Sequence, residues 1–156
     1  MLTERDRAIG LAITVNDILT SYIEVHNDVF KVSGRRIIPI PGYFEAINFK
    51  QHVETLENLY AKLSQIDQDI TRWIGNGVKN PEVRDFLIVL RSYSKALLDA
   101  IKEFESISRQ LYKKSQDPDS YVWKSYSKDL EKYEKAIERY RMLGQILNES
   151  YKCLNK

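Results

Sequence analysis

Apolar residues recur at alternating spacings of three and four along most of this chain, and this feature limits its fold more than any other. In the first segment they fall at Ala8, Leu11, Val15, Ile18, Tyr22, Val25 and Val29. Such spacing places the apolar side chains on one face of an α-helix. No stretch of strand length alternates apolar and polar residues with a period of two. The pattern therefore predicts an all-α fold.

Three clusters of turn-forming residues divide the chain into four periodic segments. The clusters are SGRRIIPIPG at 33–42, GNGVKNP at 75–81 and SQDP at 115–118. We expect helices at about 3–32, 48–74, 81–114 and 118–154. Thr3 and Asn48 are placed to cap the first two helices, Asn80-Pro81 to start the third, and Gly75 to end the second.

Four long helices with short connections suggest one four-helix bundle. A chain of 156 residues with 43% apolar residues suits a single domain, residues 1–156, with its own core. Two of the connections are short, so we expect an antiparallel up-down-up-down arrangement. The longer connection at 33–47 also permits a crossover topology.

The sequence contains no pattern for a membrane span or a leader segment. Its longest apolar run is the five residues from Phe86 to Leu90, whereas a transmembrane helix needs about 20 mostly apolar residues. We therefore expect no membrane insertion. The single cysteine, Cys153, and the absence of a signal-like start suggest a reducing, cytoplasmic location.

Residue patterns for known kinds of catalysis are missing. A di-iron bundle needs Glu-x-x-His pairs, but Ile23 and Phe49 stand three residues before His26 and His52. The chain has no Gly-x-Gly-x-x-Gly, no phosphate-binding loop and no Gly-x-Ser-x-Gly. We expect a protein that is not an enzyme and that has no metal or cofactor.

Basic residues gather at the end of the predicted bundle that holds the first connection. Arg35 and Arg36 lie in that connection, and Lys113 and Lys114 end the third helix. Helix N-termini at the same end would add partial positive charge, so a small anion is one expected ligand. Nearby acidic residues, including Asp28 and Asp117, give the alternative that the charges neutralise each other.

Histidines and aromatic residues give two further sets of candidates. His26 and His52 fall near one end of antiparallel neighbours, where they either share a ligand or form separate hydrogen bonds. Trp123, Tyr126, Tyr133 and Tyr140 lie on the stripe of the last helix. Three interpretations of these residues are open. They line a small-molecule cavity, they form a surface on which nucleobases stack, or they flank the core with their hydroxyls in water.

Two more features bear on partners. The apolar, Pro-containing connection 35–44 either plugs the end of the core or binds a partner, and apolar residues off the main stripes favour self-association. The run KDLEKYEKAIERYR at 128–141 alternates in charge and predicts a solvated helix face. A formal net charge of +2 makes nucleic acid an unlikely partner.

These observations favour a non-enzymatic helical bundle that acts through protein–protein interaction. We expect it to form a homo-oligomer or to be a subunit of a larger assembly. The alternatives are a regulatory bundle that binds a small molecule or anion, and a nucleic-acid accessory protein. Ligand-binding candidates are His26, Arg35, Arg36, His52, Lys113, Lys114, Trp123 and Tyr126.

Overall fold

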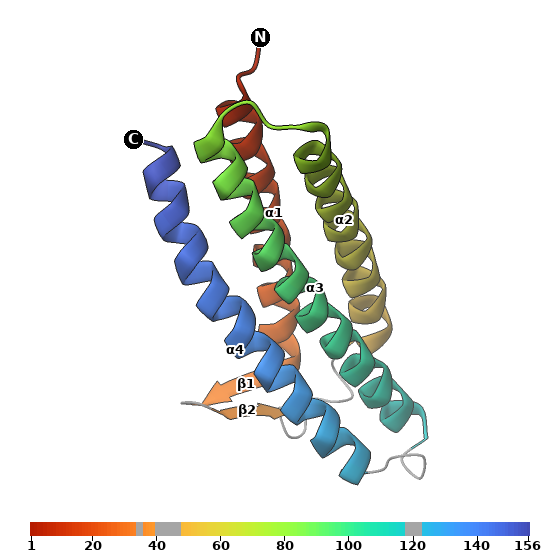
Figure 1. The fold of residues 1–156 in the computed structure, drawn as a ribbon. Helices are drawn as coiled ribbons and strands as arrows, with labels where there is room; N and C mark the ends of the chain where they lie inside the picture. The colour runs from red at the N-terminus through yellow and green to blue at the C-terminus, as the bar shows by residue number, and fades with distance from the viewer. Residues whose placement is uncertain (34–35, 40–47, 118–122) are drawn as a thin grey trace.

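The computed structural model describes residues 1–33, 36–39, 48–117 and 123–156. Four α-helices and one short hairpin make up this part of the chain (Figure 1). The elements are α1 Glu4–Val29, β1 Phe30–Ser33, β2 Arg36–Pro39, α2 Phe49–Asn76, α3 Pro81–Gln116 and α4 Trp123–Leu154. The predicted all-α, four-helix fold is confirmed, because the helices pack against each other around a shared core.

Local signals set most of the helix ends. Thr3 and Asp6 form a complete capping box at the start of α1, and Asn48 caps α2 through Gln51. Asn80 accepts from the backbone of α3, with Pro81 as its first residue. The prediction that Gly75 ends the second helix was wrong, since α2 continues to Asn76 and Gly77 takes the positive φ of 95°.

The first helix ends earlier than the sequence pattern suggested. Instead of continuing to 32, α1 stops at Val29, and Phe30 takes an extended backbone with its N–H bonded to the His26 carbonyl. Strands β1 and β2 then pair antiparallel, with Phe30 opposite Pro39 and Val32 opposite Ile37. The β-branched and aromatic residues here suit a strand. The sequence of β1, FKVS, alternates over only four residues and that of β2, RIIP, does not alternate, so the period-two criterion missed both strands.

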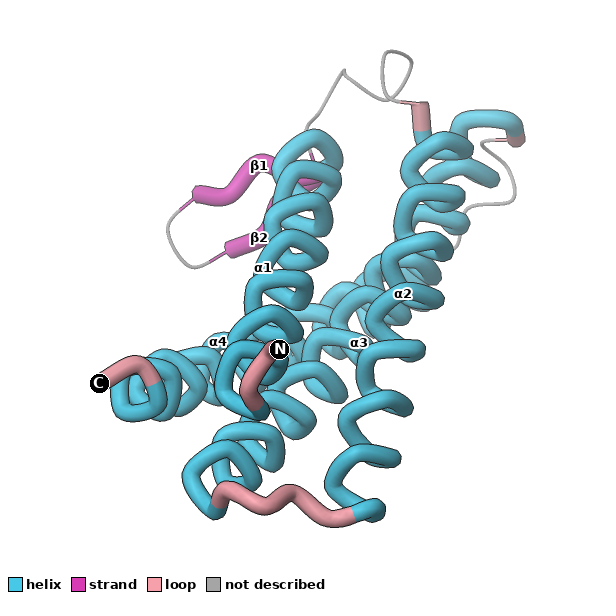
Figure 2. Tube along the Cα trace, turned by 90° about the horizontal axis from the view of Figure 1, so that it is seen from above, coloured by secondary structure: helices cyan, strands magenta, loops and turns pink. Residues whose placement is uncertain are grey.

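Helix α3 is the centre of the fold. It packs closely on α2 on one side and on α4 on the other, whereas α1 packs less closely on its neighbours. Seen from above, the β1–β2 hairpin lies beside α1 on the side away from α2 (Figure 2). In Figure 1 the colours run down α1, up α2, down α3 and up α4. The start of the last helix predicted at 118 lies outside the described residues.

Helix α1 is more apolar than its position in the fold requires. By length and composition, it is the one helix among the described residues that could cross a membrane, although the longest apolar run did not indicate this. The expectation of no membrane insertion stays a prediction. A core helix passes the same test, but only 28% of the most apolar stretch of α1 is buried. The apolar side chains of α1 therefore face more than the bundle core.

Candidate functional site

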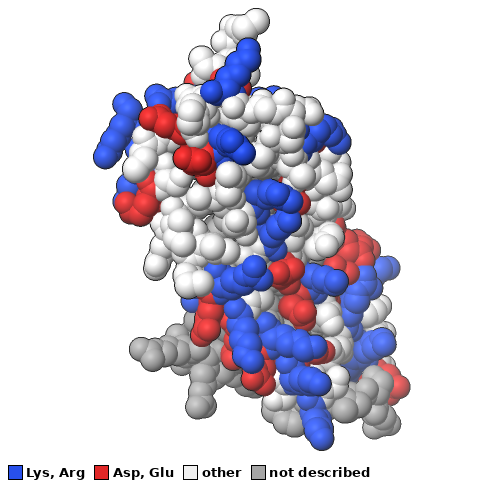
Figure 3. Space-filling view, viewed as in Figure 1, with Lys and Arg blue, Asp and Glu red and all other residues white. Residues whose placement is uncertain are grey.

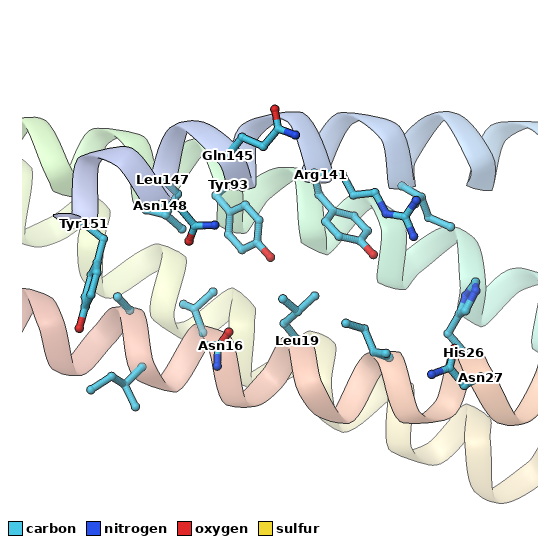
Figure 4. Close-up of a pocket in the computed structure, with 17 residues that line it drawn as sticks. Asn16, Leu19, His26, Asn27, Tyr93, Arg141, Gln145, Leu147, Asn148 and Tyr151 are labelled. Atoms are coloured by element: carbon cyan, nitrogen blue, oxygen red, sulfur yellow. The ribbon is translucent and has the colours of Figure 1, made fainter. Parts of the chain in front are cut away.

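A groove of about 620 Å³ runs between α1 and α4 (Figure 4). Its volume lies within the roughly 300–1,000 Å³ typical of small-molecule sites. The α1 side contributes Ala12, Ile13, Val15, Asn16, Leu19, Ile23, His26 and Asn27. The other side consists of Tyr93 from α3 and Ile137, Tyr140, Arg141, Gly144, Gln145, Leu147, Asn148 and Tyr151 from α4.

Two small residues, Ala12 and Gly144, line the groove and leave its space unfilled. Gly144 has no side chain, and the ring of Tyr93 leans against it: a Cβ at this position would lie 3.2 Å from the Tyr93 Cε2 atom. Ala12 leaves space on the facing side of α1. The walls are mainly apolar, with amide side chains such as Asn16 and Asn148 between them (Figure 4).

A network of buried hydroxyls and one imidazole joins α1 to α4 beside this groove. The Tyr133 hydroxyl lies 2.7 Å from His26 Nδ1 and is also hydrogen-bonded to the hydroxyl of Tyr22. Tyr140 extends the network, since its hydroxyl interacts with Tyr22 and with Arg141. Phe104 of α3 stacks on Tyr133 with ring centroids 5.1 Å apart. The network is therefore enclosed by aromatic packing.

Burial fixes the protonation of this network. Desolvation, with a smaller contribution from the Arg141 guanidinium, lowers the pKa of His26 from 6.5 to about 4. Desolvation also raises the pKa of Tyr22, Tyr133 and Tyr140. At neutral pH the imidazole is therefore uncharged and the hydroxyls keep their protons.

Whichever way its protons are arranged, the network has one hydrogen-bond donor left over at one of its two ends, His26 or Tyr140. If Tyr133 donates to His26 Nδ1, the neutral imidazole carries its proton on Nε2. If His26 Nδ1–H donates to Tyr133 instead, Tyr133 donates to Tyr22 and Tyr22 donates to Tyr140. The hydroxyl proton of Tyr140 then has no acceptor within the network. His26 and Tyr140 both line the groove. The network thus offers the groove an N–H or an O–H.

Arg141 is the charged side chain of the groove at neutral pH. Among the described residues, no Asp or Glu lines the groove, and none forms an ion pair with Arg141. The guanidinium extends from α4 toward the end of the groove that His26 occupies (Figure 4). One end therefore combines a cation with neutral donors, which suits oxygen acceptors.

Of the predicted site residues, the structure places His26 in the groove and His52 elsewhere. His52 Nε2 contacts Asp28 Oδ2 at 2.5 Å, while His26 bonds to Tyr133. The two histidines therefore have separate partners, as in the simpler of the two interpretations. Within the described ranges, no three His, Cys, Asp or Glu side chains gather where they could hold a metal ion.

The predicted basic end is described only in part. Arg35 lies outside the described residues, Arg36 begins β2, and Lys113 and Lys114 lie in the last turn of α3. Figure 3 shows basic and acidic side chains interspersed over the lower part of the α3–α4 face, so this face carries no broad patch of one sign. The anion site predicted there stays a prediction.

The aromatic candidates at the start of α4 have different outcomes. Tyr126 is 1% exposed and belongs to the core, so it presents no surface on which a base could stack. Trp123 is the first residue of α4, and its side chain lies outside what the structure describes.

Sequence reasoning missed the main polar residue of the groove. Arg141 ends the charged run 128–141 and fits a solvated helix face by its pattern, while Asn16 and Asn148 fall between apolar stripe positions. The available signal was the Tyr140-Arg141 pair, which lies one helical turn before Gly144. Because glycine has no side chain, this part of the helix surface has room for a ligand. This signal indicates a groove only when α1 is known to lie opposite this part of α4.

Comparison with protein-family models, with curated proteins and with solved structures finds no match to this chain, so the geometry of the groove carries the functional argument.

Proposed function

We propose that this protein is a non-enzymatic binding protein whose α1–α4 groove holds an elongated amphipathic small molecule. The observation that carries the proposal is the groove itself, with mainly apolar walls, a few amide side chains along it and one cation toward one end. It runs beside α1 from Ala12 to Asn27, which at 1.5 Å per residue is about 22 Å. A long, narrow ligand uses this shape better than a compact one.

The proposal also accounts for the composition of α1. Its apolar surface is wider than its buried stripe, and Ile13 and Ile23, which line the groove, are exposed. A bound apolar chain would remove these side chains from water, with a gain of about 25 cal/mol per Å² of apolar surface. Ligand binding would therefore draw α1 and α4 together.

A neutral fluorescent probe tests the proposal without assuming a charge on the ligand. N-phenyl-1-naphthylamine brightens in apolar surroundings, and we expect saturable binding to the full chain. Asn16 faces the groove, so Asn16→Phe fills it and raises the Kd at least about tenfold, equivalent to 1.4 kcal/mol. Asn58 is exposed on α2 and away from the groove, so Asn58→Phe is the matched control and leaves the Kd unchanged. Equal binding by both variants would refute the proposal.

Association with a protein is a second candidate function, supported by exposed apolar side chains on the same two helices. Ile13 and Ile23 on α1 are 53% and 39% exposed, and Met142 and Ile146 on α4 are 60% and 51% exposed. Side chains of this size at a surface favour an interface with a partner or a second copy.

Light scattering after size exclusion tests self-association. We expect a concentration-dependent dimer that Ile13→Ser weakens, because the substitution removes apolar area from the α1 surface. Ile88 on α3 is 46% exposed, so Ile88→Ser makes the same chemical change on another helix and should leave the dimer intact. A monomer at every concentration would exclude this candidate in its self-associating form.

A further inference from the structure

Arg141 has no carboxylate partner among the described residues, unlike three other cations of α4. Arg139 lies 3.6 Å from Asp99, and Lys135 and Lys152 pair with Glu131 and Glu149 on their own helix. In the part of the chain that the structure describes, no such ion pair involves Arg141. Its interactions are instead with Tyr140 and, through space, with the buried network around His26.

The surroundings of Arg141 favour negative charge. The groove carries no acidic side chain among its described lining residues, and the network adds an N–H or O–H donor beside the guanidinium. A charge-assisted hydrogen bond from a guanidinium to an anion is stronger than a hydrogen bond between neutral groups. A positively charged ligand would meet the guanidinium without any compensating carboxylate.

The charged side chain of the groove, Arg141, lies toward one end, whereas the uncharged amide of Asn148 lies toward the other (Figure 4). His26 lies at one end with Arg141 nearer to it, while Leu147 and Tyr151 lie toward the other end (Figure 4). A ligand with a charged head and an apolar tail has one favourable orientation in such a site. The head lies at Arg141, and the tail extends toward Tyr151.

We propose that the ligand of the groove is an anionic amphiphile, an apolar chain with a carboxylate or phosphate head, and that Arg141 binds that head. This inference rests on the proposed function, since it names the chemical class of the molecule that the groove takes. It assigns to Arg141 a role in ligand selection.

Displacement of N-phenyl-1-naphthylamine tests the inference with three probes of equal chain length: dodecanoate, dodecyl phosphate and dodecan-1-ol. All are used at pH 7.5 and below the concentrations at which they aggregate. We expect at least one of the two anions to bind the wild-type chain about tenfold or more tightly than the alcohol. The two anionic probes distinguish a carboxylate from a phosphate head.

Substitutions at position 141 assign that preference to its cause. Arg141→Gln should weaken anion binding to the level of the alcohol and leave alcohol binding within about twofold, because only the charged contact is lost. Arg141→Lys keeps the charge and should keep most of the preference. Arg139→Gln removes an equal charge from the outer face of the same helix and should change nothing. Circular dichroism confirms that each variant is folded.

The outcomes separate this inference from the proposed function. Equal binding of alcohol and anions by the wild-type chain, or an anion preference that survives in Arg141→Gln, overturns the role of Arg141 while the groove stands. Failure of the neutral probe and of all three amphiphiles to bind overturns the groove as a ligand site, and this inference with it.

Discussion

Lowering the pH should destabilise this protein through one residue, His26. Its imidazole is neutral in the folded chain because burial lowers its pKa from 6.5 to about 4. Above pH 6.5 the imidazole is neutral in both the folded and the unfolded chain, so it adds no pH dependence. Between pH 6.5 and about 4 the unfolded chain binds a proton that the folded chain excludes. Stability is therefore lost as the pH falls through this range.

The size of the effect follows from the pKa difference. Each pKa unit corresponds to about 1.4 kcal/mol, so His26 should lower the free energy of unfolding by about 3 kcal/mol between pH 7 and pH 4. Small domains are stable by only about 5–15 kcal/mol, so this is a large fraction. Below about pH 4 the contribution stops growing, because both states then bind the proton.

Urea unfolding followed by circular dichroism at pH 7, 5.5 and 4 measures this contribution. The wild-type chain should lose about 3 kcal/mol more than His26→Gln over this range, since glutamine does not titrate. Carboxylates with lowered pKa values, such as Glu4 and Asp6, also make the free energy of unfolding depend on pH. Their contribution is the same in the wild type and in His26→Gln, so it cancels when the two proteins are compared. His52→Gln is the matched control and should keep the His26 contribution. Equal pH dependence in wild type and His26→Gln would refute the buried, neutral imidazole.

Three substitutions test other parts of the fold by urea unfolding at pH 7. Tyr133→Phe removes a buried hydroxyl that serves two hydrogen bonds, and should cost about 1–3 kcal/mol; an unchanged free energy of unfolding would contradict the network. Thr3→Ala breaks the capping box of α1 and should cost about 1 kcal/mol, with loss of helix ellipticity near the N-terminus. Gly144→Val places side-chain atoms against the Tyr93 ring and should cost about 1–3 kcal/mol; a gain in stability would show that the ring yields easily.

Helical periodicity in the sequence was sufficient to predict most of the core. Val15, Ile18 and Tyr22 on the first stripe are buried, and so are Leu56 and Leu63 on the second. These positions follow from the spacing alone, because a helix with one apolar face must bury that face against another element. The cap residues Thr3, Asn48 and Asn80 act as their types and positions predict.

The hairpin and the groove depend on information that a stripe does not contain. Phe30 fits a helical register as well as a strand, and its extended backbone is supported by packing on His26 and Phe104. The groove depends on how far α1 stands from α4, which is set by contacts between helices distant in the chain. Arg141 is exposed, as the charged run predicts, but the run does not show that this residue borders a groove.

The most direct test of the groove as a ligand site is an NMR titration of the ¹⁵N-labelled chain with N-phenyl-1-naphthylamine. If the groove holds amphipathic molecules, the largest amide shifts should fall on its two walls, Ala12–Asn27 of α1 and Ile137–Tyr151 of α4, with α2 little affected. Shifts centred on α2, or none at saturating probe, would contradict the account.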